Sequence, residues 1–69
     1  MDFKVIGEYI KLDQLLKAAN AVSSGGEAKI IISEGEIKVN GEVCTQRGKK
    51  IRKGDKVASL EGSFIINVI

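Results

Sequence analysis

The fold is decided by residues 24–41, which read SGGEAKIIISEGEIKVNG. Ser24 is followed three positions later by Glu27, the spacing of a capping box, so we expect a helix to begin at Gly25. Gly35 suits the left-handed position that follows the last turn of a helix, and it predicts where this helix ends.

A β-hairpin is expected directly after this helix. Residues 36–39 alternate polar and apolar side chains as a half-buried strand does, with Lys38 pointing outward. Asn40-Gly41 is typical of a two-residue type I′ turn, so residues 42–45 should return as a second strand.

The flanking sequence predicts another helix and three more strands. Apolar residues recur from Leu12 to Ala19 at the i, i+3, i+4, i+7 spacing of a helical stripe, which places a helix at about residues 12–20. Residues 3–6 read as a short strand, and two further strands are expected over residues 56–60 and 63–68. The last strand has the position and pattern to pair with residues 3–6.

Sixty-nine residues make one domain, so we assign residues 1–69 to a single unit. The expected element order is β-α-α-β-β-β-β. This order predicts the α+β class, with two helices packed on a small antiparallel or mixed sheet.

Positive charge is concentrated in residues 47–56, called here the basic segment. It holds six of the chain's eleven lysines and arginines, namely Arg47, Lys49, Lys50, Arg52, Lys53 and Lys56, and one acidic residue, Asp55. The segment therefore carries +5, whereas the whole chain carries only +2. Charged loops are often merely solvated, but like charges this dense destabilise a loop unless a polyanion relieves them. We expect a surface loop that binds a polyphosphate partner.

The composition argues against catalysis and against a cofactor. The chain has no histidine, which removes the usual general base and the commonest zinc ligand. Its single cysteine, Cys44, can form no internal disulfide and has no imidazole partner. No apolar run approaches the ~20 residues of a membrane span, and no secretory signal is recognised at the N-terminus. We expect a reduced, cytoplasmic, non-enzymatic protein with no small-molecule substrate.

Several spaced motifs resemble the S4 RNA-binding domain. Within residues 24–41 the chain matches the family's spaced Ser, Glu-Ala-Lys, Gly and Val-Asn-Gly elements. Residues 12–16 (LDQLL) are similar to the family's opening helix, and residues 53–57 (KGDKV) to its Gly-Asp-x-Val strand entry. The similarity covers about residues 11–60.

Within that family, the chain looks closest to the small stand-alone bacterial S4 proteins. It shares with them Gly-Gly-Glu-Ala-Lys at residues 25–29 and Thr-x-Arg-Gly-x-Lys-Ile-Arg at residues 45–52. Gly25 stands where many S4 domains carry arginine, so one expected phosphate contact is absent. The resemblance implies an S4-like (alpha-L motif) fold and a bare RNA-binding module for structured ribosomal or transfer RNA, with a role in ribosome assembly or translation.

Ten residues are candidates for RNA binding. Arginines fork onto phosphate oxygens, and lysines act as point charges. Open amides at the helix start at Gly25 suit a phosphate, although these glycines have an equally good explanation in close packing against the first helix. The family likeness adds the lysines beside the first helix and in the first hairpin strand. The set is Lys11, Gly25, Gly26, Lys29, Lys38, Arg47, Lys49, Lys50, Arg52 and Lys53.

The scarcity of aromatic residues indicates what kind of RNA is read. Recognition of single strands usually depends on stacked aromatic side chains, and only Tyr9 is a candidate for that role here. We therefore expect a monomer that reads the shape and phosphates of folded RNA. The alternative is a protein-interaction adaptor that meets an acidic partner through the basic segment.

Overall fold

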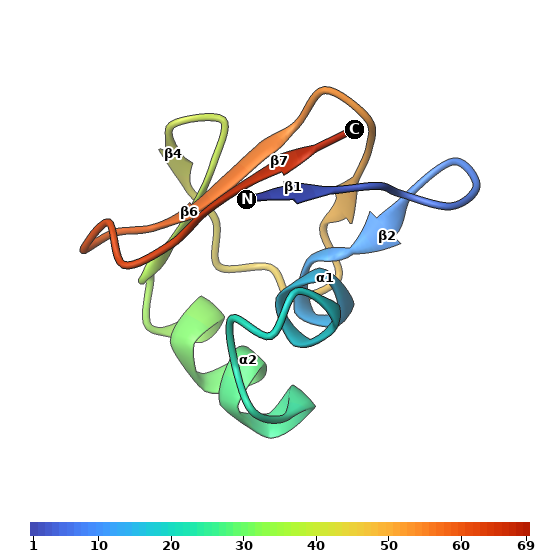
Figure 1. The fold of residues 1–69 in the computed structure, drawn as a ribbon. Helices are drawn as coiled ribbons and strands as arrows, with labels where there is room; N and C mark the ends of the chain where they lie inside the picture. The colour runs from blue at the N-terminus through green and yellow to red at the C-terminus, as the bar shows by residue number, and fades with distance from the viewer.

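The computed structural model describes the whole chain, residues 1–69, as helices beneath one face of a twisted sheet (Figure 1). Both expected helices are present, and the α+β class is confirmed. The elements are β1 (Asp2–Phe3), β2 (Ile10–Lys11), α1 (Leu12–Ala18), α2 (Gly25–Ser33), β3 (Ile37–Val39), β4 (Glu42–Val43), β5 (Lys50–Ile51), β6 (Lys56–Ser59) and β7 (Ile65–Val68).

The main sheet has five strands in the order β1-β7-β6-β3-β4. Strand β7 pairs with β1 in parallel, and every other neighbour in this sheet is antiparallel, so the sheet is mixed. The expected pairing of the two terminal strands is therefore confirmed, although β1 spans Asp2–Phe3 and shares only Phe3 with the expected strand at residues 3–6. The first and last strands thus lie side by side at this edge, with the N-terminus beside the start of β7 (Figure 1).

The local signals in residues 24–41 are confirmed. The Ser24 hydroxyl accepts a hydrogen bond from the Glu27 amide at 3.2 Å, and α2 begins at Gly25. Gly35 adopts a φ of 77°, as the residue that ends the helix. Asn40 and Gly41 have φ of 52° and 85°, the positive pair that a type I′ turn requires.

A continuous apolar core lies between the helices and the sheet. Its 13 buried residues are all hydrophobic, and no buried side-chain polar atom lacks a partner. The core consists of Leu12, Leu15, Leu16, Ala19, Val22, Ala28, Ile32, Ile37, Val39, Ile51, Val57, Ile66 and Val68. Neither helix has the length and apolar character needed to cross a bilayer.

A second, two-stranded sheet differs from the expected element order. Strand β5, inside the basic segment, pairs antiparallel with β2, just before α1. We expected residues 47–56 to be a surface loop. The structure instead has a short strand there, paired with β2 along one edge, and Ile51 within it is fully buried.

Candidate nucleic-acid interface

The basic segment is fixed to the start of α1 through its backbone. The Lys49 carbonyl accepts a hydrogen bond from the Leu12 amide at 2.9 Å, and the Arg47 carbonyl accepts one from the Asp13 amide at 3.1 Å. These amides belong to the first turn of the helix, where no intrahelical acceptor exists. The Lys11 side chain does not cap this helix, so the basic segment supplies the cap.

The β2–β5 pair brings Lys11 beside the basic segment. Lys11 lies directly opposite Lys50 in the antiparallel register, and Ile10 lies opposite Ile51. Directly opposed residues have Cβ atoms about 4.5–5.5 Å apart, and like charges at this spacing destabilise a sheet. Both lysines are exposed. The fold therefore places these two lysines side by side in the sheet, where an anion would relieve any repulsion between them.

Tyr9 extends this cluster of cations. The Lys50 ammonium lies 5.1 Å from the centroid of the Tyr9 ring, and the Arg52 guanidinium carbon lies 5.9 Å from it. Both distances are within the range of cation–π attraction. Tyr9 thus orients two cations of the basic segment, instead of presenting an uncovered ring.

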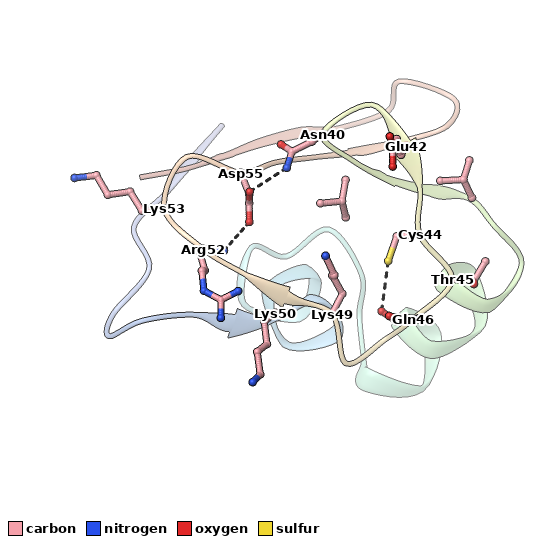
Figure 2. A pocket seen from close by; sticks show the side chains of 12 residues that line it. Asn40, Glu42, Cys44, Thr45, Gln46, Lys49, Lys50, Arg52, Lys53 and Asp55 are labelled. Atoms are coloured by element: carbon pink, nitrogen blue, oxygen red, sulfur yellow. Dashed lines mark hydrogen bonds between the residues drawn. The ribbon is translucent and has the colours of Figure 1, made fainter.

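Asp55 fastens the far end of the basic segment. Its carboxylate accepts hydrogen bonds from the Arg52 amide at 2.8 Å and from the Asn40 side-chain amide at 3.0 Å (Figure 2). The Asn40 side-chain oxygen in turn accepts from the Lys56 amide at 2.9 Å. The Arg52 amide is the main reason that the pKa of Asp55 lies below its usual value; Asn40 and the charges of Lys49 and Arg52 act in the same direction.

The backbone of strand β7 completes the attachment. The Gly54 amide donates to the Val68 carbonyl at 2.8 Å, and the Val68 amide donates to the Asp55 carbonyl at 2.9 Å. The basic segment is therefore tied down by α1, β2, β7 and the β3–β4 turn.

Four of the candidate cations line one open hollow, of about 710 Å³, between the β3–β4 hairpin and the basic segment. They are Lys49, Lys50, Arg52 and Lys53. Figure 2 shows Lys49 pointing toward the hairpin, while Lys50 and Arg52 point to the opposite side of the segment. None of these side chains is hydrogen-bonded to a carboxylate, and the Asp55 oxygens accept from the Arg52 and Asn40 amides instead. Arg47 is exposed at the preceding turn, and Lys11 joins through the β2–β5 pair.

Two lysines lie elsewhere on the sheet. Lys38 lies between the buried Ile37 and Val39 in β3, so its side chain projects from the outer face of the sheet, which the helices do not cover. It lines a separate hollow of about 380 Å³ together with Lys56. The structure thus separates Lys38, and Lys56 of the basic segment, from the cations around Lys50.

The start of α2 holds the remaining candidates. Gly25 and Gly26 are exposed, and an added Cβ would meet nothing within 4 Å at Gly25 and only the Ser24 hydroxyl at 3.8 Å at Gly26. The explanation by close packing against the first helix is therefore wrong. Their amides make no hydrogen bond within the chain. Lys29 is exposed on the same helix, and no hydrogen bond links it to the basic segment.

Three residues contribute to this surface in ways that the sequence did not reveal. From the sequence, Tyr9 was a candidate for stacking on a base or a partly buried tyrosine, Asn40 a turn residue, and Asp55 the lone opposing charge and part of the Gly-Asp-x-Val strand entry. Their shared signal is position, since all three lie next to the end of a strand, Asp55 within the basic segment and the other two in contact with it. No group of three or more histidine, cysteine or acidic residues is arranged to hold a metal ion.

Known proteins similar to this chain are of three kinds. A probable ribosome maturation protein, RlbA of Bacillus subtilis (strain 168), is 47% identical over 62 residues, which are 90% of this chain and 86% of that protein. A putative RNA-binding protein, YbcJ of Escherichia coli (strain K12), is 42% identical over 72% of this chain and 71% of its own length. An uncharacterized RNA pseudouridine synthase of Aquifex aeolicus (strain VF5) is 37% identical over 83% of this chain, which corresponds to only 18% of the enzyme.

A solved structure and a family profile complete the comparison. The trimeric structure of Vibrio cholerae heat shock protein 15 superposes with a TM-score of 0.70 at 22% identity. The match covers 84% of this chain but 58% of that one, and it supports the fold. The profile described as S4 domain matches residues 3–67. The resemblance seen in the sequence is thereby confirmed, and the chain belongs to the S4 domain family.

Proposed function

We propose that this chain is a non-catalytic module that binds structured RNA, either ribosomal or transfer RNA, chiefly through phosphate contacts. The observation that carries the proposal is the attachment of the basic segment, which holds Lys50, Arg52 and Lys11 together without carboxylate partners. Cations gathered at one place and left unpaired by the protein suit a chain of phosphates.

Each part of the surface has a distinct role in this proposal. Arg47 and Arg52 bind phosphate oxygens with two parallel donors, while Lys11, Lys49, Lys50 and Lys53 contribute point charges. The open amides of Gly25 and Gly26, with Lys29 one turn later, hold a second stretch of phosphates. Lys38 contacts RNA only where the RNA also reaches the outer face of the sheet.

The names of the relatives support this assignment. One is a probable ribosome maturation protein and another a putative RNA-binding protein, and both match the chain over most of its length. We infer a cytoplasmic role in ribosome assembly or translation, carried out as a monomer. The match to the pseudouridine synthase covers only 18% of that enzyme. We therefore do not transfer its activity to this chain.

The test is a binding titration with ribosomal RNA fragments at several salt concentrations. Phosphate contacts release counterions, so the logarithm of the affinity should fall with the logarithm of the salt concentration by roughly 0.7–0.9 per contact. The double variant Lys50→Gln/Arg52→Gln should reduce this slope by roughly 1.5 and weaken binding at low salt. The variant Lys4→Gln/Lys17→Gln is its control, because it removes the same charge at two exposed positions outside the basic segment.

Two outcomes would contradict the proposal. One is binding that does not depend on salt, and the other is an equal loss of affinity in both double variants. A pull-down from cells then separates RNA from an acidic protein partner. Partners that remain bound after nuclease treatment, and are lost with Lys50→Gln/Arg52→Gln, would favour the adaptor instead.

A further inference from the structure

The hollow between the β3–β4 hairpin and the basic segment has the dimensions of a ligand site. Its volume of about 710 Å³ falls within the roughly 300–1,000 Å³ that small-molecule sites span. It is open to solvent on one side, and its walls come from two parts of the chain that are fixed to each other by Asn40 and Asp55 (Figure 2). A site held in this way exists before a ligand arrives.

The walls of the hollow carry cationic, apolar, neutral polar and acidic side chains, and the acidic ones are Glu42 on the hairpin and Asp55, whose oxygens accept from amides. Lys49 points into it from the basic segment, as Figure 2 shows. Val39, Val43 and Cys44 provide an apolar patch on the hairpin side. The side-chain amide of Gln46 and the hydroxyl of Thr45 make no hydrogen bond within the chain. Only the backbone carbonyl of Gln46 is engaged, and it accepts from the Cys44 thiol.

We propose that this hollow receives one unpaired nucleotide that is turned out of a folded RNA. The base lies against the apolar patch, the free amide of Gln46 and hydroxyl of Thr45 contact the edge of the base, and Lys49 binds the phosphate. This inference rests on the proposed function and deepens it. The ligand class is then a helical RNA with a bulged or looped-out residue, not a regular duplex.

The arrangement of charges favours a nucleotide that remains part of an RNA strand. Lys50 and Arg52 point to the opposite side of the basic segment from Lys49 (Figure 2). Phosphates on either side of one nucleotide can thus be held outside the hollow while the base between them enters it. Turning a base out of a helix costs least where the base is already unpaired, which makes a bulge the preferred target.

The test compares three RNA hairpins with the same stem. One carries a single-nucleotide bulge, prepared with each of the four bases; one carries an abasic nucleotide at that position; one is fully paired. The abasic hairpin is the matched control, because it keeps the bent backbone and lacks only the base. We expect the best of the bulged hairpins to bind roughly tenfold more tightly than the abasic one, given the usual strength of contacts to an unstacked base.

Cys44 offers a second measurement that needs no variant. It is the only cysteine of the chain, it is half-buried, and it lines the hollow. Bulged RNA at saturating concentration should slow the alkylation of Cys44 by iodoacetamide, and abasic RNA at equal occupancy should not. In the reverse experiment, protein already alkylated at Cys44 should lose its preference for the bulged hairpin and keep its affinity for the paired one.

The outcomes separate this inference from the proposed function. Equal affinity for bulged and abasic hairpins, with equal exposure of Cys44, would overturn the nucleotide site and leave salt-dependent RNA binding intact. Failure of all three RNAs to bind would overturn both.

Discussion

Asp55 is an acidic residue whose removal should weaken the binding of an anion. Counting charges alone, replacing Asp55 with alanine makes the basic segment more positive and should tighten RNA binding. The structure predicts the opposite, because the Asp55 carboxylate accepts hydrogen bonds from the Arg52 amide at 2.8 Å and the Asn40 side chain at 3.0 Å. Without them the segment loses its attachment to the β3–β4 turn.

The size of the effect follows from these two bonds. A hydrogen bond to a charged group contributes about 1.5–3 kcal/mol, and water partly replaces it where the group is as exposed as Asp55. We therefore expect Asp55→Ala to lower the free energy of unfolding by ~1–2 kcal/mol, or the midpoint of thermal unfolding by roughly 7–14 °C. If the loosened segment must be ordered again on binding, the affinity for RNA falls by about 5- to 30-fold.

Urea denaturation and an RNA titration measure the two quantities. Glu61→Ala is the matched control, since it removes one negative charge from an exposed turn whose acidic side chain makes no hydrogen bond. This control should bind RNA as well as the unaltered protein or slightly better. The reasoning is refuted if Asp55→Ala binds as tightly as Glu61→Ala while its stability is unchanged.

Three further changes probe the same surface. The hydrogen bond from the Arg52 amide holds the pKa of Asp55 below its usual value, so the stability that Asp55 contributes is complete above its ordinary pKa of about 3.9 and is lost as the pH falls through the lowered value. Urea denaturation should therefore be measured for the unaltered protein and for Asp55→Asn, at pH 6 and at successive pH values below 4. The difference between their free energies of unfolding should shrink as the pH falls. A difference that stays constant would contradict this. Tyr9→Leu should weaken RNA binding more than Tyr9→Phe in a titration of both variants. The phenylalanine ring keeps the roughly 0.5–1 kcal/mol of cation–π attraction that orients Lys50, and leucine does not. Ile51→Ala should lower the free energy of unfolding by about 2–5 kcal/mol in urea denaturation, since Ile51 is fully buried; a loss below ~1 kcal/mol would mean that the basic segment is not part of the core.

The helices and the hairpin could be predicted because their signals are local. The Ser24 hydroxyl, the left-handed Gly35 and the Asn40-Gly41 pair each act within a few residues of their own position. Such signals need no knowledge of the rest of the chain. They fix α2 and the hairpin, and the buried positions of the helices and strands then follow from periodicity.

The pairing of β2 with β5 could not be predicted in the same way. Each strand has only two residues, too few for an alternating pattern, and they lie some forty residues apart in the sequence. Their contact exists because both strands adjoin the start of α1. The position of Lys11 beside Lys50 is a consequence of that contact, so the sequence could nominate both lysines but could not show that they are neighbours.

The two helix starts in this protein have different uses. At α1 the first amides bind the carbonyls of Arg47 and Lys49, so the positive end of the helix meets backbone oxygen and the side chains of the basic segment are left to point outward. At α2 the amides of Gly25 and Gly26 have no partner in the chain, and no neighbouring atom requires glycine there. The first helix start therefore anchors the cations by main-chain contacts alone. Apart from Ile51 and Asp55, the side chains of the basic segment can therefore change to suit a different RNA without disturbing the fold. This arrangement is expected of a scaffold whose recognition surface evolves independently of its core.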